Sequence, residues 1–470
     1  MKSEIERIVA DVKSGRTSAR AEVERVLAQA RERDELHCLL EVCAEQALAR
    51  ADRLDVRIKK GEPVGRLVGV PYVAKDNFLT KVGHTTAASK MLDNFRSPID
   101  ATAIERIEAE DAIMIGKANL DAFAHGGSTE NSAFGPTHNA IDKGRVAGGS
   151  SGGSAVAVAS GIVPFALGSD TGGSIRQPAS FNGVVGYKPT YGMISRYGVV
   201  AMASSTDTVG PITRTVRDSE IIADILAGQD QRDGTVYPRY FSQIAESPSG
   251  QRIGLIEDFI GEGVDDDVAS RTNQLAQRLR ESGHRVDLVK LPMARYALAI
   301  YYIVIPAELS SNMARYDGIR YGERSPEAHR LDDVYGMSRD DGLMPENKRR
   351  IMIGSYVLSS GYYDAYYLKA QQARTLLIRQ LDKLFESYDF LLSPVSPTPA
   401  FKLGENTHDP LKMYLADAMT VPASLAGLPA ISVPNGRSKA GLPIGVQLIA
   451  PAKADASLLA MAKQLEADNA

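Results

Sequence analysis

The sequence predicts an α/β protein with one large domain, and three observations support this. Short apolar, strand-like runs alternate with helix-like segments along all 470 residues, a pattern typical of a sheet covered by helices. No internal repeat or low-complexity tract appears. The nearest thing to a linker, residues 246–251, is short. Length alone would allow about two to four domains, but we expect a single one.

The first elements are helical. Residues 1 to about 60 are rich in Ala, Glu, Arg and Leu, and their apolar residues recur at helical spacing, which predicts two amphipathic helices. The apolar positions are Ile5, Ile8, Val9, Val12, Val23, Val26 and Leu27. From about 61 to 245 the sequence changes to short apolar runs between glycines and turn pairs. The run 67–74 predicts a strand with Lys75 at its end.

The second half continues the alternation. Residues 253–256 and 285–289 are predicted strands, with a helix near 265–282 between them. Residues 294–386 are expected to form a mostly helical insertion. After this insertion come three predicted strands and a last helix, at 390–394, 430–434, 444–449 and about 454–467.

Composition excludes several classes of protein. The 54 basic and 58 acidic residues give a net charge of −4, which does not suit a chain that grips nucleic acid alone, although a basic partner could do so. The chain start lacks a signal-peptide core, and no apolar run of membrane-spanning length occurs, so we expect a cytoplasmic protein without a membrane span. Cys38 and Cys43 are expected to be reduced thiols, and no metal site is expected.

Two loops rich in serine and glycine are the most informative part of the sequence. They are Gly148–Ser154 and Gly168–Arg176, and Ser150 and Ser174 lie 24 residues apart. Ser174 precedes a plausible short helix, whose free N–H groups suit the binding of an oxyanion. The simpler interpretation is that Ser174 only caps this helix.

Two other interpretations of these loops are disfavoured. Gly148–Gly152 matches the Gly-x-Ser-x-Gly pattern of a nucleophile elbow, but the preceding residues look like a loop. The late histidine that an elbow needs would be His408, which lies in a polar segment typical of an exposed turn. A phosphate-binding Walker loop needs Gly-Lys-Ser/Thr, which this chain replaces with Gly-Gly-Ser-Ala.

Lys75 is the candidate base. A lysine that accepts a proton must be neutral, so its pKa must fall by about 3 units, which requires roughly 4 kcal/mol from the environment. Burial beside serine hydroxyls and apolar strands can supply this. The alternative is a lysine that extends from a strand end towards solvent. Lys75, Ser150 and Ser174 with glycine amides around them are the parts of a serine hydrolase that uses no histidine.

Taken together, Lys75, the two serine/glycine loops and the following run Gly183–Gly198 resemble the amidase signature family. The resemblance implies a single α/β/α domain around a large, mixed and twisted sheet. It implies a Ser-cisSer-Lys triad in which Ser174 is the acyl nucleophile, Ser150 the bridging serine after a cis peptide, and Lys75 the base. The implied oxyanion hole consists of the amides of Thr171, Gly172, Gly173 and Ser174, and the implied supporting residues are Ser151, Asp170 and Arg176.

The C-terminal half resembles the branch of this family that releases ammonia from glutamine for tRNA-dependent amidotransferases. The runs that carry this resemblance are 311–322, 348–354, 359–367 and 409–417. It implies that Arg350 binds the substrate carboxylate, with the adjacent Arg349 as an alternative, and that Asp417 binds its ammonium group. It also implies that Gly126, Gly127 and Ser128 line the amide end and that Tyr301 lines the exit side.

The same resemblance implies partners and cofactors. A B subunit would hold Glu-tRNA(Gln) and use ATP with Mg2+, a small C subunit would clasp this chain, and the chain itself would bind no cofactor.

One departure from the family pattern is Asn182, where many relatives have cysteine. Two rival hypotheses are a stand-alone amidase acting on another amide and a scaffold subunit with an inactive site. The presence of all three triad residues disfavours the scaffold.

Overall fold

One mixed sheet runs through the molecule. The computed structural model describes residues 3–243 and 249–468. The strands lie in the order β1-β3-β2-β4-β6-β5-β10-β11-β9-β7-β8. Their bounds are β1 Leu39–Val42, β2 Pro71–Lys75, β3 Ile113–Ala118, β4 Phe165–Asp170, β5 Val185–Lys188, β6 Thr208–Thr213, β7 Arg252–Ile256, β8 Arg285–Val289, β9 Phe390–Pro394, β10 Ala430–Arg437 and β11 Pro443–Ile449.

Helices flank this sheet. The α-helices are α1 Glu4–Ser14, α2 Ala19–Glu32, α3 Ala44–Lys59, α4 Thr102–Ala109, α5 Gly152–Ala159, α6 Arg176–Asn182, α7 Val216–Leu226, α8 Asp266–Glu281, α9 Ala294–Met313, α10 Leu331–Gly342, α11 Pro345–Val357, α12 Lys369–Phe385, α13 Pro410–Leu415, α14 Val421–Leu425 and α15 Asp455–Asp468. Short 3₁₀ turns lie at Asp34–Leu36, Lys90–Leu92, Ala122–Ala124 and Glu257–Phe259. A π-helical turn spans Tyr363–Leu368.

The pairing of the strands joins the two halves of the chain. The parallel neighbours are β3, β2 and β4 near one edge, and β9, β7 and β8 at the other. Between them the pairs are antiparallel, and β5 pairs with β10 in a register that places Lys188 opposite Ala430. Because this pair connects strands from opposite halves, the sheet is continuous from β1 to β8.

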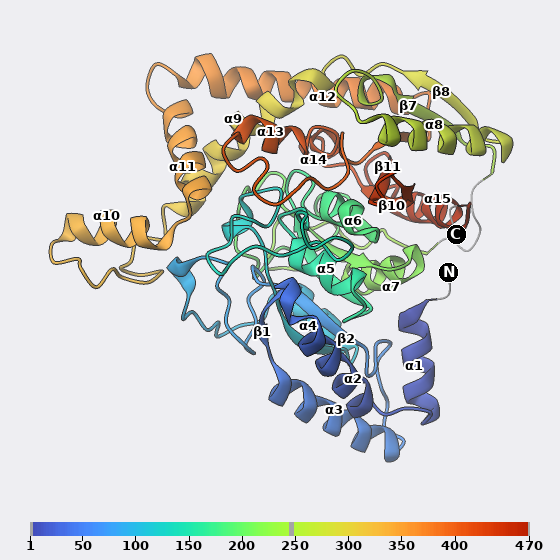
Figure 1. Ribbon diagram of the computed structural model, residues 1–470, viewed down its shortest axis with the longest axis vertical. Helices are drawn as coiled ribbons and strands as arrows, with labels where there is room; N and C mark the ends of the chain where they lie inside the picture. Colours follow the sequence, from blue (N-terminus) through green and yellow to red (C-terminus); the bar gives the residue numbers. More distant parts are fainter. Residues whose placement is uncertain (1–2, 244–248, 469–470) are drawn as a thin grey trace.

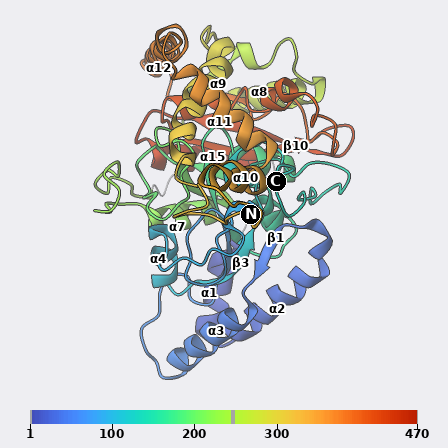
Figure 2. The ribbon, with the colours of Figure 1, turned by 90° about the vertical axis from the view of Figure 1, so that its left-hand side faces the viewer.

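Figure 1 shows how the layers are arranged. Helices α2 and α3 lie at the lower end of this view, and α9 and α12 lie at the upper end with β7, β8 and α8. Helix α10 extends away from the body in Figure 1. Figure 2 shows the ribbon turned by 90°, so that α10 faces the viewer. None of the helices within residues 3–243 and 249–468 is long and apolar enough to cross a membrane.

Apolar burial holds these layers together. Every residue of β2, β3, β4 and β6 is buried, as expected for strands covered on both faces. A second apolar cluster lies where α9 and α12 pack on the sheet, and it includes Val304 and Leu377. Each fully buried side chain of this size stabilises the fold by about 1.5–3 kcal/mol.

The predicted α/β class with one mixed, helix-flanked sheet is confirmed. The two amphipathic helices expected before residue 60 are present as α1 and α2, which bury most of the predicted apolar positions. The sequence pattern missed β1 and α3, which follow α2. Helix α3 buries Ala47, Ala51 and Leu54 at helical spacing, and alanines give only a weak apolar signal. The strand expected at 67–74 begins only at Pro71 and includes Lys75. Of the predicted linker, residues 246–248 lie outside the described residues.

Candidate active site

Lys75 is the last residue of β2 and is completely buried. Its Nζ lies 2.8 Å from Ser150 Oγ and 2.9 Å from Ser169 Oγ, and 3.3 Å from the Ser169 carbonyl oxygen. Burial lowers the pKa of Lys75 from 10.5 to about 7, although nearby carboxylates, Asp121 first among them, oppose this fall. A lysine in this environment is available as a proton acceptor near neutral pH.

Ser150 and Ser151 lie in the loop that leads into α5. The Gly149–Ser150 peptide bond is cis. Gly149 allows a close approach of backbone, because a Cβ there would stand 2.1 Å from Asp121 Oδ2. The N–H of Ser151 donates to the Ser174 carbonyl (3.1 Å), and its hydroxyl donates to the Ser169 carbonyl (3.1 Å). Ser151 therefore fastens the first serine/glycine loop to the second.

The second serine/glycine loop, Gly168–Arg176, includes the end of β4 and the start of α6, which residues 171–175 connect. Thr171 Oγ1 donates to Asp207 (2.7 Å), and the Gly172 carbonyl accepts from Thr420 Oγ1 (2.6 Å). Gly173 has φ +148°, and a Cβ there would stand 2.2 Å from Thr420 Oγ1. In the described part of the chain the backbone N–H groups of Gly172, Gly173 and Ser174 have no hydrogen-bond acceptor. They are free to bind an oxyanion.

Ser174 lies at the centre of these loops and is 8% exposed. Among the described residues its hydroxyl forms no hydrogen bond, either to Ser150 Oγ or to another group. The structure therefore brings Lys75 into contact with Ser150 through side chains. It brings the loop of Ser150 into contact with Ser174 through the backbone bond from Ser151.

A buried ion pair closes the base of the second loop. Asp170 ends β4 and Arg176 begins α6, and the two form a bidentate pair with both N–O distances at 3.0 Å. Burial alone would raise the pKa of Asp170, but Arg176 outweighs it and holds the pKa below its ordinary value. Arg176 also donates to the Thr420 carbonyl and to Gln447 Oε1 (2.9 and 3.0 Å). The predicted supporting residues thus join the nucleophile loop to the C-terminal strands.

A cavity of about 260 Å3 adjoins these loops. The residues that line it include five of the predicted substrate-binding residues, namely Gly126, Gly127, Ser128, Arg350 and Asp417. Tyr301 is buried outside this lining, with its ring against Gly172, where a Cβ would stand 2.8 Å from the ring. The lining does not include Lys75, Ser150 or Ser174. Backbone contacts link the cavity to the triad, since Gly149 lies against Ser128.

Asp417 and the arginine pair Arg349 and Arg350 are among the charged residues that line this cavity. Asp417 Oδ1 is buried and has no hydrogen-bond partner among the described residues. Burial raises the pKa of Asp417 to about 8, and Arg350 partly offsets this rise. The Arg350 side chain is 4% exposed whereas that of Arg349 is 43% exposed. Both arginines line the cavity, and of the two it is Arg350 whose side chain is buried in the protein.

Sequence reasoning missed several polar residues around the site. Gln177 bridges two loops, because its Nε2 donates to the Gly127 carbonyl (2.7 Å) and its Oε1 accepts from the Gly149 N–H (2.9 Å). Buried Asp121 accepts from the N–H of Thr129 (2.9 Å) and shapes the turn that carries Ser128. The partners of Gln177 lie 28 and 50 residues away in the chain, so no local sequence pattern could have found it.

The departure at Asn182 is a structural feature. Its Nδ2 donates to the Ala147 carbonyl (2.7 Å) and its Oδ1 accepts from the Ala140 N–H (3.0 Å). Asn182 thereby holds the segment before the first serine/glycine loop and contacts no triad residue.

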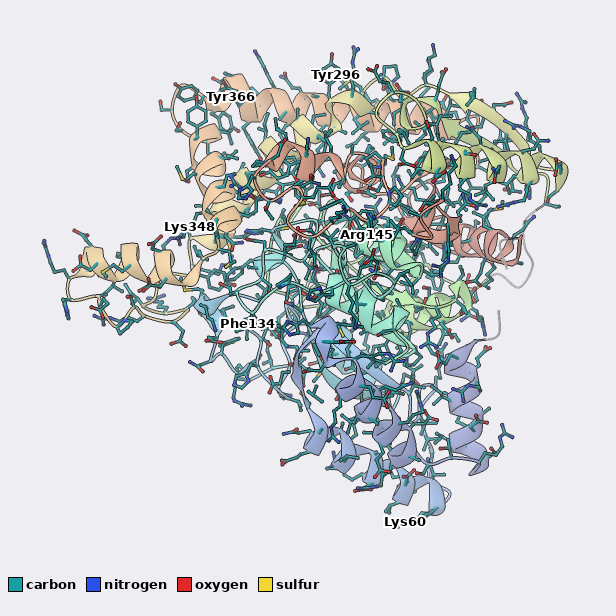
Figure 3. All side chains as sticks on the ribbon, in the orientation of Figure 1. Lys60, Phe134, Arg145, Tyr296, Lys348 and Tyr366 are labelled. Atoms are coloured by element: carbon teal, nitrogen blue, oxygen red, sulfur yellow. The ribbon has the colours of Figure 1, made fainter. Side chains whose placement is uncertain are left out.

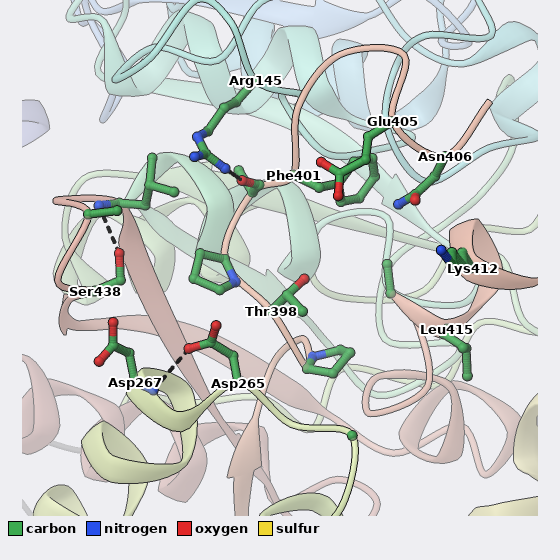
Figure 4. Close-up of a pocket in the computed structure, with 17 residues that line it drawn as sticks. Arg145, Asp265, Asp267, Thr398, Phe401, Glu405, Asn406, Lys412, Leu415 and Ser438 are labelled. Carbon is green, nitrogen blue, oxygen red and sulfur yellow. Dashed lines mark hydrogen bonds between the residues drawn. The ribbon is translucent and has the colours of Figure 1, made fainter. Parts of the chain in front are cut away.

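A second cavity of about 450 Å3 lies on the other side of α13 (Figure 4). Lys412 and Leu415 of α13 line it, whereas Met413 and Tyr414 line the first cavity. None of the predicted site residues lines this second cavity. Within residues 3–243 and 249–468 no group of three or more His, Cys, Asp or Glu side chains is placed to hold a metal ion.

A family model described as Amidase matches residues 21–459, and the chain belongs to the amidase family. It is 49% identical over 436 residues to the A subunit of the glutamyl-tRNA(Gln) amidotransferase of Koribacter versatilis, a match that covers 92% of this chain and 91% of that protein. It is 51% identical over 418 residues to the corresponding protein of a Cyanothece strain, which covers 88% and 87%.

Solved structures agree with these sequence relatives. The crystal structure of the A subunit of glutamyl-tRNA(Gln) amidotransferase from Thermotoga maritima superimposes with a TM-score of 0.80 at 40% identity, covering 96% of this chain and 92% of that one. A structure described as an amidase superimposes with a TM-score of 0.86 at 30% identity and covers 99% and 100%. The predicted family is confirmed.

Proposed function

We propose that this chain is the glutamine-hydrolysing A subunit of a glutamyl-tRNA(Gln) amidotransferase. The observation that carries the proposal is the cavity beside the two loops. It combines the buried Oδ1 of Asp417, which has no partner among the described residues, with the buried guanidinium of Arg350. Such a pair matches the ammonium and carboxylate groups of an α-amino acid. About 50% identity to proteins of this name over nine-tenths of the chain supports the same assignment.

The proposed reaction begins with attack by Ser174 Oγ on the side-chain amide carbon of glutamine. The proton of Ser174 passes to Ser150 while the proton of Ser150 passes to Lys75, whose lowered pKa suits a base. The N–H groups of Gly172, Gly173 and Ser174 stabilise the negative oxygen of the tetrahedral intermediate. The carbon–nitrogen bond then breaks, and the proton returns from Lys75 through Ser150 to the leaving ammonia.

The second half of the reaction releases glutamate. Water attacks the ester formed on Ser174, and Lys75 again accepts a proton through Ser150. When the ester bond breaks, the proton returns to Ser174 Oγ and the enzyme is restored. The supporting geometry is the 2.8 Å separation of Lys75 Nζ and Ser150 Oγ.

The ammonia serves a reaction on a partner. We propose that a B subunit binds Glu-tRNA(Gln), uses ATP and Mg2+ to activate its glutamate, and receives the ammonia to form Gln-tRNA(Gln), and that a small C subunit clasps this chain. Because this reaction needs aminoacylated tRNA, we place it in the cytoplasm. The net charge of −4 agrees with an assembly in which the partner grips the tRNA.

Ammonia release from L-glutamine tests this proposal. The tagged chain is purified with the proteins that bind it and is compared with a Ser174→Ala variant. We expect release that depends on Ser174, that increases with Glu-tRNA and ATP, and that falls at least about 10-fold in an Asp417→Ala variant, because a buried charge pair with the substrate is lost.

Other outcomes favour the rivals. Ser174-dependent hydrolysis of other amides without glutamine hydrolysis would assign the chain to the stand-alone amidases, as the similarity to the solved amidase allows. A complex that forms Gln-tRNA(Gln) at the full rate, with glutamine as the nitrogen donor, in spite of Ser174→Ala would indicate an inactive scaffold.

A further inference from the structure

Arg350 is held by groups that the proposed reaction does not use. Its Nε donates to Glu346 Oε1 (2.7 Å), one helical turn earlier on α11. The guanidinium carbon lies 5.1 Å from the ring centroid of Tyr302 and 5.6 Å from that of Tyr414. Aromatic faces attract a cation at this distance. In the described part of the chain the two terminal nitrogens of Arg350 form no hydrogen bond, so they are left to the cavity.

Tyr414 connects this arrangement to a second element. Its hydroxyl donates to the same Glu346 Oε1 (2.8 Å), and its ring stacks on Tyr302 with a centroid separation of 3.8 Å. Tyr414 belongs to α13, and Asp417 follows three residues later. One carboxylate oxygen therefore ties α11, which carries Arg350, to the segment that carries Asp417.

Glu346 lines the cavity, but its carboxylate is engaged by protein donors. Its carboxylate accepts from Arg350, Tyr414 and, through Oε2, Arg349, so its acceptor sites face protein donors. The side chain is 13% exposed. An ionised carboxylate only accepts hydrogen bonds, so it has nothing to donate to the carboxylate of a substrate. Its contacts are therefore directed at Arg350 and α13.

We propose that Glu346 and Tyr414 are positioning residues that set the specificity of the site for amides with an α-amino acid head group. Glu346 fixes the Nε edge of Arg350, so that the fork of two terminal nitrogens faces the cavity. Tyr414 fastens α13 to α11 and so fixes the separation between that fork and Asp417. The inference rests on the proposed function, in which Arg350 binds the α-carboxylate and Asp417 the α-ammonium group.

Two substrates separate this role from a general structural one. L-glutamine carries the α-carboxylate, and 4-aminobutanamide is the same molecule without it. The variants Glu346→Gln and Tyr414→Phe remove the charge and the hydroxyl, respectively, with little change in size. Steady-state hydrolysis of both amides is measured with the complex that the full chain forms with its partners.

With L-glutamine we expect Glu346→Gln to raise KM at least about 10-fold while kcat stays within about 3-fold, since a charge-assisted contact with the substrate is weakened in the ground state and transition state alike. Tyr414→Phe should raise KM about 3-fold. With 4-aminobutanamide, which has no carboxylate for Arg350, kcat/KM should change less than about 2-fold in either variant. Retained hydrolysis of this amide also shows that the variants fold.

Matched controls lie nearby on the surface. Asp340 pairs with Lys348 of α11, which is labelled in Figure 3, and Tyr363 is an exposed tyrosine of the π-helical turn. Asp340→Asn and Tyr363→Phe remove the same chemical groups away from the cavity and should leave both substrates unaffected. Equal loss of kcat/KM for both amides in Glu346→Gln, or no loss for either, would overturn the positioning role.

Failure of the proposed function has a different signature. If the wild-type complex hydrolyses 4-aminobutanamide and L-glutamine with equal kcat/KM, this would contradict recognition of the amino acid head group, whatever the variants do. A wild-type complex that prefers L-glutamine, and whose Glu346→Gln variant keeps the full preference, contradicts only the positioning role.

Discussion

At the scale of the residue, Lys75 shows how burial lowers the pKa of an amino group. Its amino group is completely buried, and the loss of hydration disfavours its charged form more than the surrounding carboxylates favour it. Hydroxyl groups of Ser150 and Ser169 surround the nitrogen in place of a counter-ion. The proposed reaction needs this neutral amine, and the fold bears the cost of keeping it.

The rate of glutamine hydrolysis should therefore increase with pH through about 7. Below this pKa Lys75 is protonated and cannot accept a proton, whereas above it the neutral form predominates. The measurement is kcat at saturating L-glutamine between pH 5.5 and 8.5, which separates this effect from the titration of Asp417 in substrate binding. A kcat that is constant over this range, or that falls as the pH rises, would exclude Lys75 as the base.

The same burial predicts a stabilising substitution. Between pH about 7 and 10.5 the unfolded chain holds a proton on Lys75 that the folded chain lacks, so the free energy of unfolding rises with pH in this window. Below pH 7 Lys75 is protonated in both states, and burial of its charge destabilises the folded state by the full amount, about 5 kcal/mol. Lys75→Met removes this cost and loses the hydrogen bonds to Ser150 and Ser169, each worth about 1 kcal/mol.

We expect Lys75→Met to be inactive but more stable than the wild type by about 1–3 kcal/mol at pH 7, with a smaller difference at pH 10. Urea unfolding at the two pH values measures this. Lys60→Met is the matched control, because Lys60 is exposed and is labelled at the surface in Figure 3. A Lys75→Met variant less stable than the wild type at pH 7 would contradict the proposed cost of burial.

At the scale of the element, the turn from β4 into α6 determines where Ser174, the proposed nucleophile, lies. Asp170 and Arg176 pair across the turn, and Arg176 continues to Thr420 and Gln447. Thr420 also binds the Gly172 carbonyl. The free N–H groups of the turn are therefore held by contacts with the C-terminal half of the chain.

Asp170→Asn should destabilise the protein by about 3–5 kcal/mol, because it leaves the buried guanidinium of Arg176 without a counter-charge. Urea unfolding at pH 7.5 measures the loss. The matched control is Asp287→Asn in the exposed pair with Arg285, where we expect a change within about 0.5 kcal/mol. Equal effects of the two substitutions would show that the buried pair does not stabilise the turn.

At the scale of the whole molecule, the sheet makes the two halves of the chain depend on each other. Strand β5 pairs with β10, and α6 packs on β11. The triad residues come from the first half, whereas Arg350 and Asp417 come from the second. Neither half contains a complete site.

A fragment that ends at residue 243 should therefore fail to fold cooperatively and should hydrolyse no glutamine, although it contains Lys75, Ser150 and Ser174. Removing the second half exposes the edge of β5 and removes the partners of Arg176. Near-ultraviolet circular dichroism during thermal unfolding measures this, with the full chain as the control. A sharp unfolding transition of the fragment would show that the first half folds independently.

The sequence by itself determined the class of the fold and the family, and it predicted the three triad positions. Alternating strand and helix patterns are local signals, and the two serine/glycine loops carry a spacing that can be matched without a structure. Weaker local signals failed, as at α3, where alanines mark the buried face.

Only the tertiary structure decided how the site is completed. Gln177 and Thr420 act through contacts with residues distant in the sequence, so no local pattern reveals them. Arg349 and Arg350 both line the cavity, and only the fold determines that the side chain of Arg350 is buried while that of Arg349 is 43% exposed. The fall in the pKa of Lys75 likewise follows from burial, which several strands and loops create together.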